Sequence, residues 1–414
     1  MTDLTEMGRK AKEASRSLAA AGPKKDAALL AAADGLERGT SAILSANGED
    51  LKAAESSGMR AALLDRLTLG ESRIKGMADG LRSVAAQTDP VGEIVSGITR
   101  PNGLRIEKVR VPLGVIGIIY EARPNVTADA AAICIKAGSA VLLRGGKEAL
   151  RTNLAVESVL RTAMEQAGLP ADCVQLVHDT THESAKAMMS LTGYLDVLIP
   201  RGGKNLIRSV TEYARVPVIE TGWGNCHIYV DASADIGMAA NIVFNAKTSR
   251  PSVCNAAESL LVHRDIAERA LPAIKERLDE KHVELRGCER TRAILGDCIV
   301  PATEEDYGTE YLDYIMSVKV VDSLEEAIAH ISKYSSGHSE VIVTNSYENA
   351  RRFTAEVDSA AVYVNASTRF TDGGEFGLGA EIGISTQKLH ARGPMGAREL
   401  TTTKFIVTGS GQIR

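Results

Sequence analysis

The sequence has few aromatic residues: they make up 4% of its 414 residues and include one tryptophan. No basic run alternates with aromatic side chains, and the net charge is -5, so nothing indicates a nucleic-acid partner. The longest apolar stretch, residues 111–120, is too short to span a bilayer and contains two glycines. The segment from Met1 to Arg9 is polar and has no apolar core of the signal-peptide kind. These absences favour a cytoplasmic protein without a membrane partner.

The sequence also lacks the spacings that bind metals or build a disulfide framework. It has no C-x-x-C pair, and its six cysteines are scattered over positions 134, 173, 226, 254, 288 and 298. His178 and His182 have a helical i, i+4 spacing, but no glutamate completes an H-E-x-x-H motif. No metal site is therefore expected, and most of the cysteines are expected to be small buried hydrophobic residues.

Two nucleotide-binding signatures are missing: a Walker A loop, and a G-x-G-x-x-G that opens a helix after a strand. Instead, an N-terminal helical region ending near Ser83 is followed by a long alternation of apolar strands and helices. The strands expected in its first part are 115–120, 140–143, 174–177, 197–199 and 216–219. Those expected in its second part are 226–230, 258–262, 317–321, 341–344 and 361–364. This pattern predicts two doubly wound α/β domains, with parallel sheets that bind ligands beyond the carboxyl ends of their strands.

Cys254 is the cysteine best placed for chemistry. It lies in the run RPSVCN (250–255), a loop between a predicted helix and a predicted strand. Its thiolate would be a nucleophile if positive or dipolar neighbours lowered its pKa. The spacing alone leaves open the alternative that Cys254 is a structural residue.

Several runs resemble known enzymes. The segment from Pro251 to His263 resembles the nucleophile segment of the aldehyde dehydrogenase superfamily, and VIETG (218–222) resembles its Glu-Leu-Gly-Gly segment. Three longer runs are similar to the γ-glutamyl phosphate reductase family within that superfamily: YEARPNVT (120–127), YVNASTRFTDG (363–373) and QKLHARGPMG (387–396). The resemblance extends over essentially the whole chain. It implies an aldehyde-dehydrogenase-like fold with a small β element for oligomerisation.

The resemblance also implies a reaction: NADPH-dependent reduction of γ-glutamyl phosphate to glutamate-5-semialdehyde and phosphate, the second step of proline biosynthesis. Cys254 would form a thioester, and Asn125 would stabilise the oxyanion together with the backbone N–H of Cys254. Asn125 in a locally satisfied turn is the alternative. Glu220 matches the water-activating residue of hydrolytic members, but here it would either assist proton delivery or hold its loop. A hydrolytic NAD(P)-dependent aldehyde dehydrogenase is the alternative function, which the presence of Glu220 favours.

The resemblance places the cofactor ribose at LLRGGK (142–147), after the second strand of the first α/β part. Arg144 and Lys147, with Gly145 and Gly146 between them, offer positive charge to a ribose 2′-phosphate. NADP(H) is therefore expected in preference to NAD, although both basic residues would also suit a solvated loop.

Other residues are expected to meet the phosphates and the substrate. Arg201, Gly202 and Gly203 open a predicted helix, whose N-terminal amides would approach the cofactor pyrophosphate. Ser367 and Arg369 match the superfamily's substrate-anchoring loop, where an arginine would pair with the substrate carboxylate. Arg123 is the candidate for the phosphate group. A structural salt bridge is the alternative for either substrate arginine.

The expected domains are a cofactor-binding domain (1–95 and 113–225), a catalytic domain (226–394) and an oligomerisation element (96–112 and 395–414). The last combines a hairpin around Pro101-Asn102-Gly103 with a strand-like tail. In this superfamily such a hairpin and tail pair across subunits, so a homo-oligomer is expected. Dimer or tetramer stays open, as does an association with glutamate 5-kinase, the enzyme that supplies the labile acyl phosphate.

Overall fold

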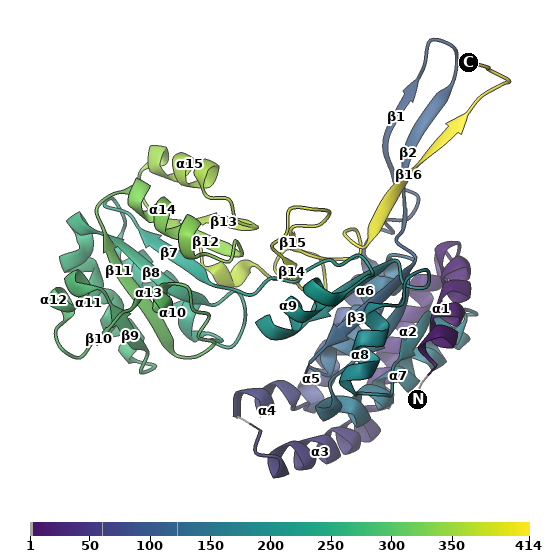
Figure 1. Cartoon of the computed structure of the whole chain (residues 1–414), viewed down its shortest axis with the longest axis horizontal. Coiled ribbons are helices and arrows are strands. Elements are labelled where there is room, and N and C mark those ends of the chain that lie inside the picture. Colours follow the sequence, from purple (N-terminus) through teal and green to yellow (C-terminus); the bar gives the residue numbers. More distant parts are fainter. Residues whose placement is uncertain (1–2, 60, 122) are drawn as a thin grey trace. The chain divides into compact units, whose positions relative to one another are not determined.

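The computed structural model describes residues 3–59, 61–121 and 123–414 (Figure 1). They form two compact units: Met1–Thr221 with Gly377–Gly383 and Met395–Arg414, and Gly222–Phe376 with Ile384–Pro394. Each unit is an α/β structure, as the sequence predicts. The division falls at residue 221 and not at 225, and the hairpin and tail belong to the first unit. In the described part of the chain, no helix is both long enough and apolar enough to cross a membrane.

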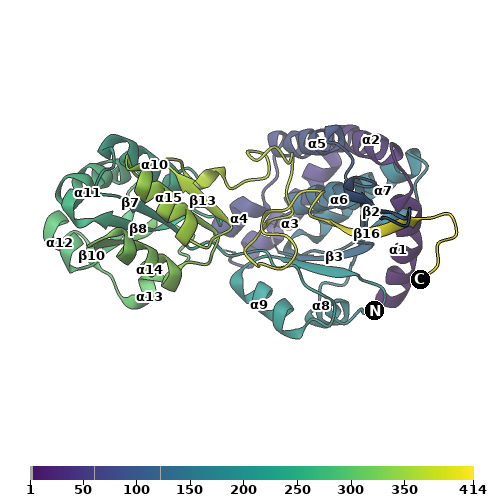
Figure 2. The same ribbon diagram turned by 90° about the horizontal axis from the view of Figure 1, so that it is seen from above.

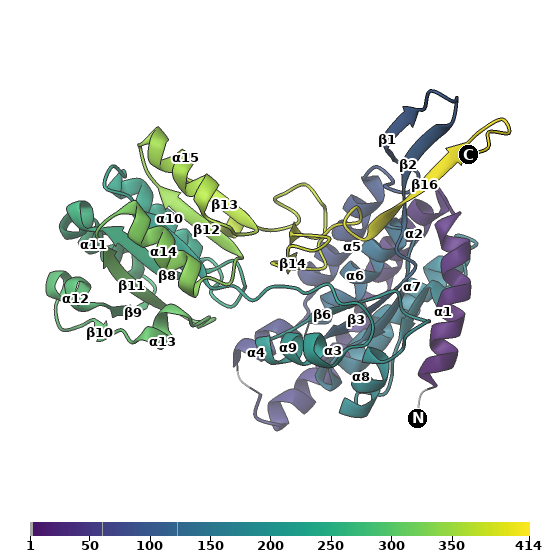
Figure 3. The same ribbon diagram turned by 45° about the horizontal axis from the view of Figure 1, so that its top comes forward.

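The first unit is built on a four-stranded parallel sheet with the order β5-β4-β3-β6. Its strands β3 and β6 lie side by side (Figure 3). The strands are β3 (Val115–Tyr120), β4 (Ala140–Arg144), β5 (Val174–Leu176) and β6 (Val197–Arg201). Every residue of β3 is buried, because helices cover both faces of the sheet. The strand expected at 216–219 does not form. Pro217 has no N–H to extend a ladder, so this segment makes only an isolated bridge between Val218 and Leu198.

The helices of the first unit cover its sheet in two layers. Those on one face are α1, α8 and α9, which share an apolar cluster with β3, β4 and β6. On the other face α6 and α7 contact the strands, and α2 and α5 pack outside them. The helices are α1 (Leu4–Ala19), α2 (Lys24–Arg38), α3 (Thr40–Ser56), α4 (Ala61–Leu67), α5 (Glu71–Ala86), α6 (Asn125–Lys136), α7 (Leu150–Gln166), α8 (His182–Met189) and α9 (Lys204–Tyr213).

The strand order reverses between β3 and β6. The chain moves outward from β3 to β4 and β5 and then crosses back to the edge strand β6, so with right-handed connections the helices that follow β3 and β6 lie on opposite faces of the sheet. The residues that follow these strands meet there, where the N–H of Glu121 donates to the carbonyl of Arg201 at 3.2 Å. Parallel sheets bind ligands at such a point, and three predicted site residues, Arg123, Asn125 and Arg201, lie next to it in the chain.

The hairpin and the tail form a separate antiparallel sheet with the order β1-β2-β16. Its strands are β1 (Ile94–Thr99), β2 (Arg105–Pro112) and β16 (Thr401–Thr408). The tail strand pairs with β2 along its whole length, from Thr401 opposite Pro112 to Thr408 opposite Arg105. The tail therefore has the hairpin of its own chain as a partner, and the outer edges of β1 and β16 are the strand edges to which the prediction of pairing across subunits applies.

The second unit contains a seven-stranded parallel sheet with the order β10-β9-β11-β8-β7-β12-β13. Its strands β7 and β8 lie side by side (Figure 2). Its strands are β7 (Cys226–Val230), β8 (Ala257–His263), β9 (Glu284–Gly287), β10 (Val300–Pro301), β11 (Ile315–Val321), β12 (Ser339–Val343) and β13 (Ala361–Val364). The sequence did not indicate β9 or β10. Both lie at one edge of the sheet, where short strands need no continuous apolar run.

Helices cover both faces of the second sheet as well. Ile228 and Val230 point to an apolar cluster shared with α10 and α11, whereas Tyr229 points to the opposite cluster with Phe353 of α15. The helices are α10 (Ile236–Thr248), α11 (Arg264–Asp279), α12 (Glu289–Leu295), α13 (Glu304–Tyr307), α14 (Leu324–Tyr334) and α15 (Tyr347–Glu356). The remaining short elements are β14 (Ile384–Ser385), β15 (Gly393–Pro394), η1 (Lys147–Ala149), η2 (Ala171–Cys173) and η3 (Thr368–Phe370).

Candidate active site

Cys254 lies in the turn that joins α10 to β8 in the second unit. It is partly exposed, whereas Cys134, Cys173 and Cys226 are buried. Because Cys254 precedes β8, it lies at the amino ends of the parallel strands and not at the carboxyl ends where the sequence pattern suggested a ligand site. The candidate nucleophile is therefore presented by a helix-to-strand turn.

The segment that leads into β7 packs directly against the backbone of Cys254. A Cβ atom at Gly224 would lie 1.5 Å from the carbonyl oxygen of Cys254, so a side chain at this position is excluded. The Cys226 thiol donates to the same oxygen at 3.2 Å. Burial raises the pKa of Cys226 far above its ordinary value and so keeps the donating proton on sulfur. The glycine at position 224 is thus required by the close approach of the Cys254 backbone.

A buried ion pair connects the two ends of the turn. Lys247 in the last turn of α10 lies 2.6 Å from Glu258 in β8 (Nζ to Oε2), and both side chains are 0% exposed. Burial lowers the pKa of Lys247 and raises the pKa of Glu258, and the attraction between the two charges opposes both shifts. Since these residues flank positions 249–256, the pair fixes the separation of the chain ends that carry Cys254.

The predicted substrate loop packs against Asn255, the neighbour of Cys254. The guanidinium of Arg369 donates through Nη1 to Oδ1 of Asn255, and through Nε to Oγ of Ser249 at 3.0 Å. Burial lowers the pKa of Arg369. Ser367 is buried, and its hydroxyl accepts from the N–H of Arg369 at 3.3 Å. The structure therefore brings Ser367 and Arg369 next to the nucleophile turn within one unit.

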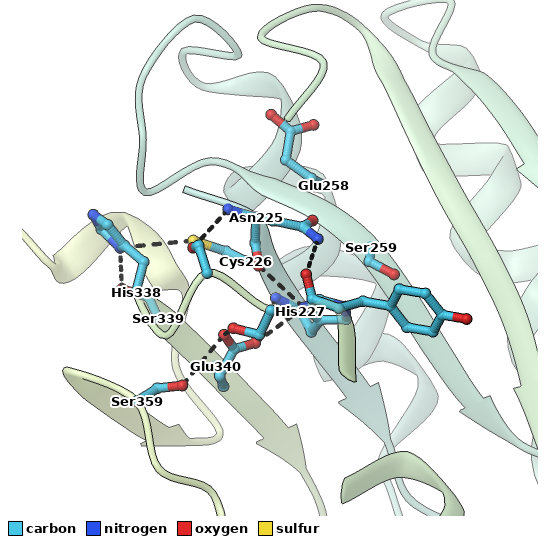
Figure 4. A network of polar contacts seen from close by, with 12 residues as sticks. Asn225, Cys226, His227, Glu258, Ser259, His338, Ser339, Glu340 and Ser359 are labelled. Carbon is cyan, nitrogen blue, oxygen red and sulfur yellow. Dashed lines mark hydrogen bonds and ion pairs between the residues drawn. The ribbon is translucent and has the colours of Figure 1, made fainter. Parts of the chain in front are cut away.

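A buried polar network connects β7 to β12 behind this turn (Figure 4). Nδ1 of His338 lies 3.7 Å from Sγ of Cys226 and 2.8 Å from Oγ of Ser339. The carboxylate of Glu340 accepts from the backbone N–H of His227 at 2.7 Å. All five side chains are fully buried. They tie the amino ends of two neighbouring strands together at the level of the nucleophile turn, and sequence reasoning singled out none of them for this role.

In the first unit, Asn125 is the first residue of α6. Its Nδ2 donates to Oδ2 of Asp129, one helical turn later, at 2.8 Å. Burial raises the pKa of Asp129 to about 6, and the hydrogen bond from Asn125 and the charge of Arg201 oppose this rise. The sequence-based search did not identify Asp129, although its i, i+4 spacing from Asn125 was a usable signal.

The structure places the remaining predicted catalytic and substrate residues in the first unit. Arg123 lies between β3 and α6, and Glu220 follows the bridge at Val218. Both are partly buried. Ala122, which belongs to the same family-like run as Arg123, lies outside the described residues. Asn125, Arg123 and Glu220 thus belong to one unit, whereas Cys254 and its neighbours belong to the other.

Arg144 ends β4 and is held by backbone carbonyls. Its Nη2 donates to Thr180 at 2.6 Å and to Thr181 at 2.8 Å. Burial lowers the pKa of Arg144. Its Nε is a buried donor without a hydrogen-bond acceptor among the described atoms. Lys147 is exposed at the start of η1. The loop therefore offers an anionic group one cation held by backbone carbonyls and one exposed cation.

Both glycines of this loop lie close to neighbouring side chains. A Cβ atom at Gly145 would lie 2.3 Å from Nδ2 of Asn153, and one at Gly146 would lie 2.1 Å from Oε1 of Glu148. Sequence reasoning overlooked Glu148, which places a carboxylate in the same loop as the two cations. Close backbone approach and an unsatisfied guanidinium donor are what a phosphate-bearing dinucleotide requires, so these residues fit such a cofactor.

The start of α9 already has an anionic partner. The N–H of Gly203, the residue before α9, donates to Oε2 of Glu121 at 2.9 Å. A Cβ atom at Gly202 would lie 2.4 Å from the same oxygen. A pyrophosphate that used the Gly203 amide, as the sequence predicts, would first have to displace the Glu121 carboxylate.

Comparison with known proteins gives matches over the whole chain. The model of the aldehyde dehydrogenase family matches residues 2–292. The chain is 60% identical to γ-glutamyl phosphate reductase from Moorella thermoacetica over 413 residues, which covers 100% of this chain and 99% of the relative. It is 58% identical to the enzyme of the same name from Carboxydothermus hydrogenoformans, with 100% of both chains covered.

Solved structures agree with these matches. The crystal structure of γ-glutamyl phosphate reductase from Thermotoga maritima, 51% identical, superposes with a TM-score of 0.96 over 100% of both chains. An acetylating aldehyde dehydrogenase from Geobacillus thermoglucosidasius, 17% identical, shares the fold with a TM-score of 0.72 and 100% coverage of both chains. The chain therefore belongs to the aldehyde dehydrogenase family and, within it, to the γ-glutamyl phosphate reductases.

Proposed function

We propose that this protein reduces γ-glutamyl 5-phosphate with NADPH to glutamate-5-semialdehyde and inorganic phosphate, the second step of proline biosynthesis from glutamate. The observation that carries the proposal is the 60% identity, over the full length, to a relative that bears the name of this activity. The partly exposed Cys254, in a turn fixed by Gly224, Cys226 and the Lys247–Glu258 pair, supports a covalent route.

In this route the Cys254 thiolate attacks the acyl carbon of the substrate. The C–S bond forms, the C–O bond to phosphate breaks, and phosphate leaves with the electron pair. NADPH, when bound, supplies the hydride that reduces the thioester carbon. The thiohemiacetal on Cys254 then collapses: its C–S bond breaks, the aldehyde leaves, and the thiolate is restored.

The amide of Asn125 and the backbone N–H of Cys254 are assigned to the oxyanion that develops in both steps. Removing one such donor typically costs about 10²–10³ in rate. Glu220 is assigned to proton delivery toward the thiohemiacetal oxygen or to holding its loop. Glu220→Gln distinguishes these roles, because only the first removes a titration from the pH–rate profile.

Arg369 is assigned to the substrate carboxylate, with Ser367 beside it, and Arg123 to the phosphate group. Arg369 would exchange its bonds to Asn255 and Ser249 for the ligand. Because Asn255 follows Cys254, substrate binding at Arg369 would act directly on the nucleophile turn.

The proposal predicts that the reverse reaction requires inorganic phosphate. With glutamate-5-semialdehyde and NADP⁺, NADPH formation should depend on phosphate, because only phosphate can release the acyl group from Cys254 as the acyl phosphate. Absorbance at the reduced-nicotinamide band, with and without phosphate, measures this. A rate indifferent to phosphate would identify a hydrolytic aldehyde dehydrogenase, with Glu220 as the base that activates water.

NADP(H) is the proposed cofactor, bound through Arg144, Lys147 and the glycines between them. Lys147→Ala should raise the KM for NADPH about tenfold, a typical cost for a lost charged contact, and leave the KM for NADH nearly unchanged. Lys52→Ala, which removes an exposed lysine on α3, is the control. An equal rise in the KM for NADPH and the KM for NADH would mean that Lys147 does not bind the 2′-phosphate.

A homo-oligomer is also proposed, because the sheet β1-β2-β16 exposes large apolar side chains. Ile98 is 54% exposed, Phe405 is 67% exposed and Val407 is 56% exposed. Phe405→Glu should shift the sedimentation coefficient toward the monomer, whereas Tyr347→Glu, at an exposed position of the second unit, should not. A monomeric wild type would contradict the proposal. Sedimentation with added glutamate 5-kinase tests a kinase association in the same experiment.

A cytoplasmic location completes the proposal. All six cysteines are free thiols, which suits a reducing compartment. Fractionation of cells, followed by detection of the protein, tests the location.

A further inference from the structure

We propose that Asp129 is a positioning residue for this reaction: its carboxylate fixes the side-chain amide of Asn125 so that the amide presents N–H, and not its carbonyl oxygen, to the acyl oxygen. The inference rests on the proposed function, in which Asn125 stabilises the oxyanion. It adds a residue that acts through Asn125 and not on the substrate.

The geometry at the start of α6 carries the argument. Oδ2 of Asp129 lies 2.8 Å from Nδ2 of Asn125. An ionised carboxylate only accepts hydrogen bonds, so the amide can satisfy it with Nδ2 alone. A flipped amide would place Oδ1 of Asn125 against a carboxylate oxygen at the same distance, and two acceptors would repel each other. One amide N–H is thus committed to Asp129, and the direction of the second is fixed with it.

The surroundings of Asp129 allow the carboxylate to be switched by pH. Arg201 at the end of β6 is the charged group whose field acts on it, and a Cβ atom at Gly80 of α5 would lie 4.0 Å from its Oδ1. Burial raises the pKa of Asp129 to about 6, above the ordinary range, in spite of Arg201 and the bond from Asn125. Above this pH the carboxylate is ionised and specifies the amide orientation.

Below this pH Asp129 is protonated and no longer fixes the orientation of the Asn125 amide. A protonated Asp129 can donate to the carbonyl oxygen of Asn125, which permits the flipped amide. The rate of the wild-type enzyme should therefore fall as the pH decreases through about 6, because the population with N–H toward the acyl oxygen decreases. A residue that merely stabilised α6 would produce no such limb in the kcat profile.

The test is a double-mutant cycle in the phosphate-dependent reverse reaction. Asn125→Ala should lower kcat by about 10²–10³, the usual cost of one oxyanion donor. Asp129→Asn, which has nearly the same shape but both donates and accepts, should lower kcat by about 10-fold or more, change the KM for the aldehyde by less than about 3-fold, and remove the acid limb. In the Asn125→Ala background, Asp129→Asn should change kcat by less than about 2-fold.

If Asp129→Asn lowered kcat by the same factor with and without Asn125→Ala, the inference would be overturned while the proposed function stands. An inactive wild-type enzyme would overturn the proposed function and the inference with it. Asp129→Glu keeps an acceptor-only carboxylate and should retain more activity than Asp129→Asn. If Asp129→Asn folds poorly, the kcat profile of the wild-type enzyme is the test, and the absence of an acid limb near pH 6 would overturn the inference. The reverse order of these two variants would contradict the inference.

Discussion

Replacing Cys254 by alanine is expected to abolish the phosphate-dependent formation of NADPH from glutamate-5-semialdehyde. Without the thiol no thioester forms, and loss of a covalent nucleophile typically lowers kcat by about 10⁴-fold or more. Binding should survive, because Cys254→Ala removes one partly exposed side chain. The measurement is kcat in the reverse reaction, together with tryptophan quenching or calorimetry for NADPH binding.

The matched control is Cys288→Ala. Cys288 is also partly exposed and also in the second unit. Burial raises its pKa, but hydrogen bonds from Thr291 and from backbone amides outweigh this, so the pKa lies below its ordinary value. A thiol-reactive reagent alone would therefore not identify the nucleophile. Activity that survives in Cys254→Ala but is lost in Cys288→Ala would contradict the assignment.

The second large effect is expected for the buried pair beneath the nucleophile turn. Lys247→Met leaves Glu258 without its partner in a fully buried position. Breaking a buried ion pair in this way typically lowers the free energy of unfolding by about 3–5 kcal/mol. The turn that carries Cys254 should loosen as well, so kcat should fall before the protein unfolds. Thermal or urea unfolding of the full chain, followed by circular dichroism, measures the loss.

Two comparisons show whether burial is the cause. Lys75→Met breaks the exposed pair with Asp79, where the expected loss is below about 1 kcal/mol. The double variant Lys247→Met, Glu258→Leu removes both buried charges and should recover most of the stability lost in Lys247→Met. Equal losses for Lys247→Met and Lys75→Met would show that the buried pair does not stabilise the second unit.

The sequence predicted most of the two main sheets, because their strands are short apolar runs between helices. It was wrong at 216–219, where an apolar run contains Pro217 and forms only one bridge. It did not indicate β9, in which two of four residues are charged, or β10, which has only two residues at the sheet edge. Apolar runs therefore predicted the strands of three or more mostly apolar residues, including the edge strands β5 and β13, and failed where a strand is interrupted by charged residues or has only two residues.

For the candidate site, the sequence led to Cys254, Asn125 and the loop of Arg369, because each lies in a contiguous run of residues that resembles the family. Residues that act on these through space were not found, with Gly224 and Asp129 as the main examples. Gly224 is required only because a distant turn approaches its backbone. Asp129 was within reach of a helical spacing argument, but its raised pKa arises from burial, which no local pattern reveals.

The sequence by itself thus determined the fold class, the family and the identity of the candidate nucleophile, because each can be recognised from contiguous stretches of residues. Only the tertiary structure decided that the tail pairs with the hairpin of its own chain and that Lys247 and Glu258 hold the nucleophile turn. The same is true of the hydrogen bond that the carboxylate of Glu121 accepts from the backbone N–H of Gly203. These outcomes depend on which distant segments the packed core brings together. Hydrogen bonds and ion pairs of this kind become specific only when burial excludes water as the competing partner.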